Sequence, residues 1–314
     1  MKGNPFKFRS KADLLSENIA ENLLNGEEAA EVVDGESLKD SLILMLKTNP
    51  MALVGALIIL IFALAAIFAP FVAPYDPIAM NLADRLQAPS WAHPLGTDDI
   101  GRDVLSRIIY GGRISLMIGI VPSLISLTIG ATLGLMAGYI GGWVDGLIMR
   151  MADIVLAFPS LLLAMVIMYI MGASLFNLFI ALSMVNWAST ARVVRAQTMS
   201  LKQKEFIEAA HSMGVRRFMI MFRHILPNCL ASMIVLFTLD VPSAIMYEAS
   251  LSFLGVGAQP PTASWGLMVS IGKQHANNCP WLILAPGFAI LLIVMAFNFL
   301  GDGLRDSIDP YTKN

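Results

Sequence analysis

Residues 48–75 read TNPMALVGALIILIFALAAIFAPFVAPY, 28 consecutive positions without Asp, Glu, Lys or Arg. An α-helix needs roughly 20 apolar residues to cross a hydrocarbon core about 30 Å thick. The stretch is long enough for one crossing, and it predicts that a helix anchors the chain in a membrane here.

Further stretches of the same kind follow along the chain. Residues 154–191 form a run of 38 positions without such a charge. As one helix this run would be about 57 Å long, too long for a single crossing, so Gly172 to Ser174 are predicted to turn a hairpin. The predicted spans are 48–73, 114–138, 154–171, 174–191, 229–250 and 281–300. The sequence therefore predicts an all-α, polytopic membrane protein with about six transmembrane helices.

The composition agrees with a membrane protein and excludes other classes. Hydrophobic residues make up 56% of the 314 positions and charged residues 14%, against roughly 25% charged residues in a soluble domain. The net charge of -2 argues against a nucleic-acid partner. Cys229 and Cys279 belong to no CxxC pair and are predicted on opposite sides of the membrane, so neither a disulfide nor a metal site is expected.

Positive charges are distributed unevenly among the predicted loops. The loops on the side of the two termini carry 16 of the 21 Lys and Arg residues, and the loops at 76–113 and 251–280 carry five. Because loops rich in Lys and Arg stay in the cytoplasm, both termini are predicted to be cytoplasmic. Residues 1–47 and 311–314 are predicted tails around a transmembrane domain, 48–310, that contains a cytoplasmic loop, 192–228.

That loop carries the most informative motif, Glu208-Ala209-Ala210-His211-Ser212-Met213-Gly214, followed by His224-Ile225-Leu226-Pro227-Asn228. Phe206, Ala209, Ala210 and Met213 fall at i, i+3, i+4 and i+7, which predicts a short amphipathic helix with a narrow apolar stripe. Gly214 is predicted to end this helix in the left-handed conformation. By physics alone, such a helix either docks on a partner or covers the protein's own underside.

The motif resembles the EAA motif of ABC-importer permeases, with Glu208, Ala209, Ala210, Gly214, Leu226 and Pro227 in register. His224 stands where the general pattern has Ile, and Arg223 to Asn228 are similar to the peptide-importer branch. The resemblance implies the type I ABC-importer permease fold and a coupling helix, Glu208 to Gly214, that fits a groove on an ATPase subunit.

Three other segments resemble the C-type permeases of bacterial dipeptide and oligopeptide importers, also called the peptide/nickel type. They are His93–Asp98 with residues that follow to Arg113, Glu248–Gly255, and Gly301–Asp306 with Asp309-Pro310. The resemblance implies a non-enzymatic permease subunit in the bacterial cytoplasmic (inner) membrane. Its expected partners are a second, B-type permease, two cytoplasmic ABC ATPases, an extracytoplasmic peptide-binding protein and the lipid bilayer.

Two acidic residues fall within the fifth predicted span. Asp240 lies near its middle, and a carboxylate in hydrocarbon is costly, so Asp240 is predicted to face a cavity, a water file or a partner group. Glu248 lies near the outer end, where partial hydration is expected. Both are candidates for the translocation pathway; the alternative for Asp240 is a protonated or hydrogen-bonded role between helices.

Near the second span, Thr97 or Asp98 is predicted to start a helix by accepting the free amide hydrogens of its first turn. The acidic residues and His93 nearby have no familiar metal-ligand spacing.

No cofactor is predicted, because Gly272-Lys273 is followed by Gln274 rather than by the Ser or Thr of a nucleotide-binding loop. The main alternative function is an ion-coupled secondary transporter or channel, which would not depend on Glu208 to Gly214. An intramembrane hydrolase would need a catalytic dyad at membrane depth, and all four histidines map to loops or their edges.

Overall fold

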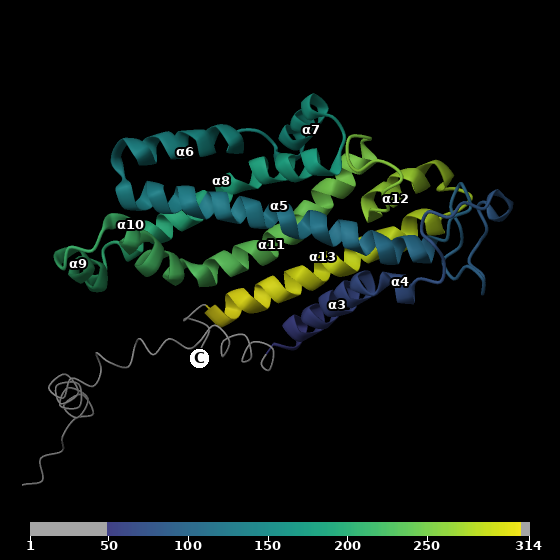
Figure 1. The fold of residues 1–314 in the computed structure, drawn as a ribbon, viewed down its shortest axis with the longest axis horizontal. Coiled ribbons are helices and arrows are strands. Elements are labelled where there is room, and N and C mark those ends of the chain that lie inside the picture. Colours follow the sequence, from purple (N-terminus) through teal and green to yellow (C-terminus); the bar gives the residue numbers. More distant parts are fainter. Residues whose placement is uncertain (1–48, 309–314) are drawn as a thin grey trace, which may run out of the picture. The chain divides into compact units, whose positions relative to one another are not determined.

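The structure, a computed structural model, describes residues 49–308. The predicted N-terminal tail, 1–47, and the predicted C-terminal tail, 311–314, lie outside the described residues. Within the described part the only strand-like pairing is an isolated bridge between Thr97 and Asp103, and the prediction of an all-α protein is confirmed. The helices of Figure 1 are α3 (Pro50–Ile67), α4 (Ala69–Val72), η1 (Leu82–Asp84), α5 (Val104–Ile140), α6 (Gly142–Leu156), α7 (Ser160–Met171), α8 (Leu175–Leu201), α9 (Glu205–Ser212), α10 (Arg217–Met219), η2 (Ile220–Ile225), α11 (Leu226–Phe253), α12 (Trp265–Gly272), η3 (Lys273–His275) and α13 (Trp281–Ile308).

Several of these helices are long and apolar enough to cross a membrane. Among the described residues there are four such segments, Pro50–Ile67, Val104–Ile140, Arg217–Phe253 and Trp281–Ser307. The pair α6 and α7 would make a fifth. The fourth predicted span, 174–191, corresponds to α8, which continues beyond the uncharged run to Leu201 and includes Arg192 and Arg195. The polytopic architecture is confirmed, and the number of six spans stays a prediction.

The structure corrects the predicted span at 154–171. Instead of one helix, the chain forms the end of α6 and then α7, which are bent by 90° at the break between them. Pro159 lies at the break, just before α7. A proline lacks an amide hydrogen and disfavours helical geometry at the preceding residue, so α6 cannot continue through Phe158 into α7. The predicted turn at Gly172 to Ser174 is confirmed, since α7 ends at Met171 and α8 begins at Leu175.

Close packing of α5 against α8 is the most extensive helix contact. Gly130, Gly134 and Gly138 lie on the α5 face that meets the backbone of α8. A β-carbon built at Gly134 would lie only 2.4 Å from the carbonyl oxygen of Ala191, so only glycine permits this approach. The two helices run side by side through the middle of the described residues (Figure 1).

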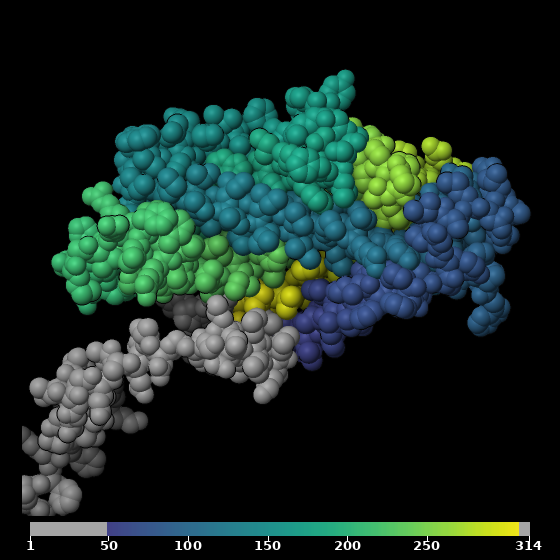
Figure 2. Space-filling view, viewed as in Figure 1, coloured from purple at the N-terminus to yellow at the C-terminus, as the bar shows by residue number. Residues whose placement is uncertain are grey.

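Two hydrophobic clusters position the regions of functional interest. One surrounds Trp265, which is 1% exposed and packs edge to face on Phe62 at 5.5 Å between ring centroids. The other joins α5, α8 and α9 to η2 through Leu135, Val194, Ile207 and Ile220. Figure 2 shows the green stretch around α9 and α10 at one end of the transmembrane helices and the blue loop before α5 at the other.

Candidate functional site

The helix predicted from the motif at Glu208 is present as α9, and the second hydrophobic cluster holds it in place. Ile207 and Ala210 are 4% and 3% exposed, and both pack into that cluster. Phe206 is 45% and Met213 77% exposed, and Ala209 is also exposed. The predicted single stripe is therefore wrong in part: Ala210 faces inward with Ile207, and the other three residues face outward. Ile207 completes an inward face at i and i+3 that the stripe had omitted.

Gly214 ends α9 as predicted. Its φ is +75°, in the left-handed region. The Gly214 amide donates to the carbonyl of His211, and the Val215 amide donates to the carbonyl of Ala210, a pair of bonds that forms a Schellman cap. The cap satisfies carbonyls at the end of the helix and fixes the direction in which the chain leaves it.

The outward side of α9 joins further exposed apolar groups on α10. Phe218 is 71% exposed and lies against Phe222 with 4.4 Å between ring centroids. We call Phe206, Ala209, Met213 and Phe218 the outer coupling face. Exposed charged residues lie on the same elements, with Glu205 and Glu208 on α9 and Arg216 and Arg217 at the start of α10. Such a mixture of exposed apolar and charged residues is typical of a protein-binding surface.

Leu226 and Pro227 lie directly after a π-helix, η2, which connects α10 to α11. The Leu226 amide donates to the carbonyl of Met221, five residues earlier, and Pro227 has no amide to donate. The Asn228 side-chain amide donates to the carbonyl of His224 at 2.6 Å. The wider π turn thus allows a helix to continue through a proline. Sequence reasoning missed this π-helix.

The two acidic residues of α11 occupy different environments. Glu248 is 1% exposed and accepts hydrogen bonds from the hydroxyls of Ser252 at 2.7 Å and Ser264 at 2.8 Å. Ser264 also caps α12, so Glu248 ties α11 to α12. The expected partial hydration of Glu248 is wrong, because α12 covers it. Asp240 is half-buried and makes no hydrogen bond or ion pair with the residues that the structure describes.

The predicted helix start at Thr97 or Asp98 is also wrong. The helix begins at Val104, and Asp103 caps it by accepting the Ser106 amide hydrogen at 2.7 Å. Asp98 instead forms an ion pair with Arg102 at 2.6 Å and lies 3.6 Å from Arg107.

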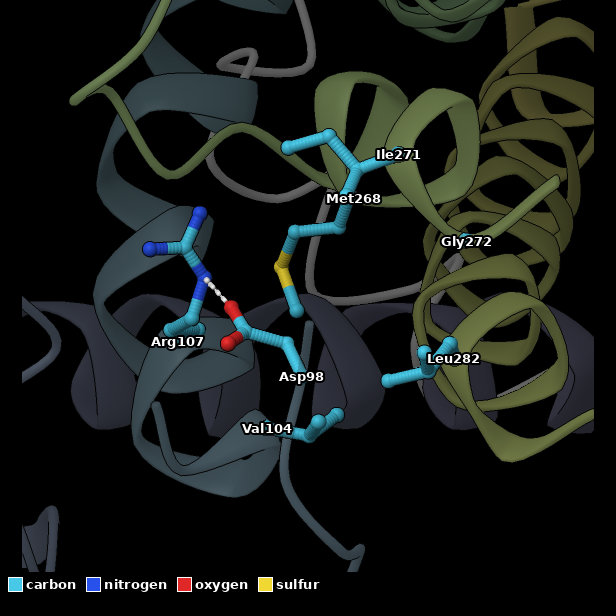
Figure 3. A pocket seen from close by; sticks show the side chains of 7 residues that line it. All are labelled: Asp98, Val104, Arg107, Met268, Ile271, Gly272 and Leu282. Carbon is cyan, nitrogen blue, oxygen red and sulfur yellow. Dashed lines mark ion pairs between the residues drawn. The ribbon is translucent and has the colours of Figure 1, made fainter. Parts of the chain in front are cut away.

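Asp98 and Arg107 face each other beside a cavity of about 10 Å³ that is lined from α5, α12 and α13 (Figure 3). A cavity of this size holds one water molecule at most, so the buried charges here stabilise the loop rather than bind a ligand. His93 hydrogen-bonds Asp103 at 3.0 Å, and no group suited to a metal ion occurs among residues 49–308.

Comparison with known proteins places this architecture in a family. Residues 130–314 match the binding-protein-dependent transport system inner membrane component family, and residues 40–89 match the N-terminal transmembrane domain of oligopeptide transport permease C. The chain belongs to the first of these families. This transport permease is therefore a multi-pass inner-membrane component and not an enzyme, and the predicted family is confirmed.

Similar proteins align with this permease along most of their length. The dipeptide transport system permease protein DppC of Alkalihalophilus pseudofirmus is 49% identical over 269 residues, which are 86% of this chain and 88% of that protein. DppC of Escherichia coli is 48% identical over 85% of this chain and 91% of its own. The oligopeptide transport system permease protein OppC of Bacillus subtilis is 40% identical over 94% and 98%.

Proposed function

We propose that this permease forms the pathway by which dipeptides or oligopeptides cross the inner membrane in an ATP-driven importer. The relatives named for dipeptide or oligopeptide transport support this substrate class, since they align with 85% or more of this chain. The proposed complex contains a second, B-type permease, two cytoplasmic ABC ATPases and an extracytoplasmic peptide-binding protein.

The proposal that an ATPase is the partner rests on the outer coupling face. It leaves Phe206, Met213 and Phe218 exposed while the inward face of α9 is fixed to the transmembrane helices. A movement of a bound ATPase would therefore reach α11 through η2. In this proposal Glu208, Ala209, Ala210 and Gly214 form the coupling helix, and Leu226 and Pro227 join it to the transmembrane domain.

The proposed orientation has both termini and α9 in the cytoplasm. The excess of Lys and Arg on that side supports it. Asp240 is the proposed pathway residue. Glu248 was predicted for the pathway as well, but its burial favours a structural role between α11 and α12.

The test of coupling uses Gly214. Replacing Gly214 by Val forces a β-branched residue into the left-handed region, at a cost of roughly 1–2 kcal/mol that disrupts the cap of α9. In the full complex reconstituted in liposomes, Gly214→Val is expected to reduce the ATPase activity stimulated by peptide-loaded binding protein by about tenfold, with the four membrane and ATPase subunits still copurifying.

The matched control is Gly214→Asn, because asparagine tolerates the left-handed conformation and no atom lies within 4 Å of an added β-carbon. This variant should keep most of the stimulation. Full stimulation in Gly214→Val, or peptide uptake by the chain alone without ATP, would contradict the ABC-permease proposal and favour an ion-coupled secondary transporter.

A further inference from the structure

One face of α11 is only partly covered by the described residues. Ser243 on this face is exposed, and Asp240, Tyr247 and Ser250 are half-buried. These four residues fall at i, i+3, i+7 and i+10, an arc of roughly 80° on a helix with 3.6 residues per turn. We call them the acceptor track.

The opposite face of α11 holds the helix in the fold. Val241, Ile245 and Glu248 are at most 1% exposed and pack toward α5, α12 and α13. On the acceptor track, Tyr247 packs against a buried cluster of this chain, whereas Asp240 has no hydrogen-bond or ion-pair partner among the described residues that would explain its charge.

Hydrogen bonding on the acceptor track leaves acceptors pointing outward. The Ser243 hydroxyl donates to the carbonyl of Leu239 at 3.2 Å, and the Ser250 hydroxyl donates to the carbonyl of Met246 at 2.8 Å. Each hydroxyl oxygen keeps lone pairs for another donor, and an ionised Asp240 has only acceptors. Residues 229–253 contain no Lys, Arg or His. The track thus matches a cation that donates hydrogen bonds.

A comparison with α3 shows which environment the track does not suit. The exposed residues of α3 include Leu57, Ile61 and Leu64, and this helix has no charged residue, as expected for contact with lipid. A carboxylate near the middle of a span is costly in hydrocarbon and normally faces a partner or a water-filled space. The acceptor track therefore faces protein or water in the assembled transporter.

We propose that the acceptor track is the wall of the pathway that faces the second permease, and that Asp240 binds the protonated amino group of a peptide as it crosses. The inference rests on the proposed peptide-importer function and adds the face of the chain and the chemical group that it recognises. An ammonium group beside Asp240 makes a charge-assisted hydrogen bond, and its other hydrogens reach the oxygens of Ser243 one turn away.

The experiment measures uptake of dialanine and of N-acetyl-dialanine per ATP hydrolysed, in liposomes that contain the full complex and the binding protein. Dividing by ATP hydrolysis removes differences in how well the binding protein delivers the two peptides. Asp240→Asn is expected to lower dialanine uptake per ATP by about tenfold, because it removes one charge-assisted hydrogen bond. The uptake per ATP of dialanine should then be close to that of N-acetyl-dialanine. Asp240→Glu should keep the preference for the free amine, and Met246→Leu on the same exposed side serves as the control.

A second variant keeps Asp240 intact. Ser243→Lys places a cation one turn from the carboxylate and should abolish dialanine uptake while the subunits still copurify. An unchanged peptide ratio in Asp240→Asn overturns the inference, and so does loss of the second permease from purified Asp240→Asn complex, which would make Asp240 an intersubunit ion-pair partner. Absence of uptake by the wild-type complex would instead refute the proposed function itself.

Discussion

At the scale of single residues, Glu248 has the clearest energetic role. Its carboxylate is buried between α11 and α12 and accepts hydrogen bonds from Ser252 and Ser264. Removing the carboxylate leaves two buried hydroxyls without their acceptor, which costs about 1–3 kcal/mol for each unsatisfied group. Glu248→Ala should therefore lower the thermal unfolding midpoint of the purified complex by several degrees.

The control for this prediction is Glu248→Gln, which keeps an acceptor oxygen and the side-chain volume and should shift the midpoint much less. Measuring peptide uptake and the unfolding midpoint for the same variants distinguishes a structural role of Glu248 from a role in transport. If Glu248→Gln retained stability but lost uptake, Glu248 would belong to the pathway and the structural role would be refuted.

The conformation of a single residue could be predicted from the sequence where only one residue type suits the required backbone geometry. Gly214 was predicted to take the left-handed conformation and does so. The start of α5 failed because Thr97, Asp98 and Asp103 are all possible caps by type. Only the fold shows that Asp98 is engaged by Arg102, leaving Asp103 to cap the helix.

At the scale of elements, the contact of α5 with α8 depends on glycine. In Gly134→Leu, the new β-carbon would lie 2.4 Å from the carbonyl oxygen of Ala191. This distance is too short, so the two helices must move apart. Overpacking of this kind costs typically 1–3 kcal/mol, and more when backbone has to move. We expect a strongly reduced yield of folded permease in the membrane, measured by size-exclusion chromatography in mild detergent.

The same substitution at Gly146 is the matched control, since that glycine of α6 has open space around its β-carbon position. Gly146→Leu should give a yield close to wild type. Equal yields of the two variants would show that α5 and α8 tolerate separation.

Element prediction from hydropathy located helices better than it located their breaks. The hairpin between α7 and α8 follows from the length of the uncharged run, which exceeds one crossing. The 90° bend between α6 and α7 escaped the same reasoning, because a proline within an apolar run is compatible with either a kinked span or a break. The direction of α9 was likewise not accessible, since its inward face packs into a cluster that also contains residues of α5, which is distant in sequence.

At the scale of the whole molecule, the proposed orientation can be tested by chemical labelling. Trp91, fully exposed in the loop before α5, is predicted outside, and Gln203, exposed between α8 and α9, is predicted inside. Cys229 and Cys279 are both buried and should react slowly. In intact cells, a membrane-impermeant maleimide should label Trp91→Cys, and Gln203→Cys should react only after permeabilisation; the reverse pattern would invert the topology.

The sequence predicted the fold class and the family, but it did not predict which residues share a face with Asp240. The all-α, polytopic class follows from apolar runs alone, and the family from the spacing between Glu208 and Pro227. The acceptor track illustrates what remained hidden: Asp240 stood out by its charge, whereas Ser243, Tyr247 and Ser250 are ordinary residues until the fold places them on the same, less buried face of α11.

The π turn at η2 has a mechanical consequence. Because it carries the helix through Pro227, residues 217–253 form one continuous helical rod. From Arg217 to Asp240 the rod is about 35 Å long at roughly 1.5 Å per residue. A tilt of about 10° around the Arg217 end would move Asp240 by about 6 Å, so a small rotation at that end is enlarged at the acceptor track.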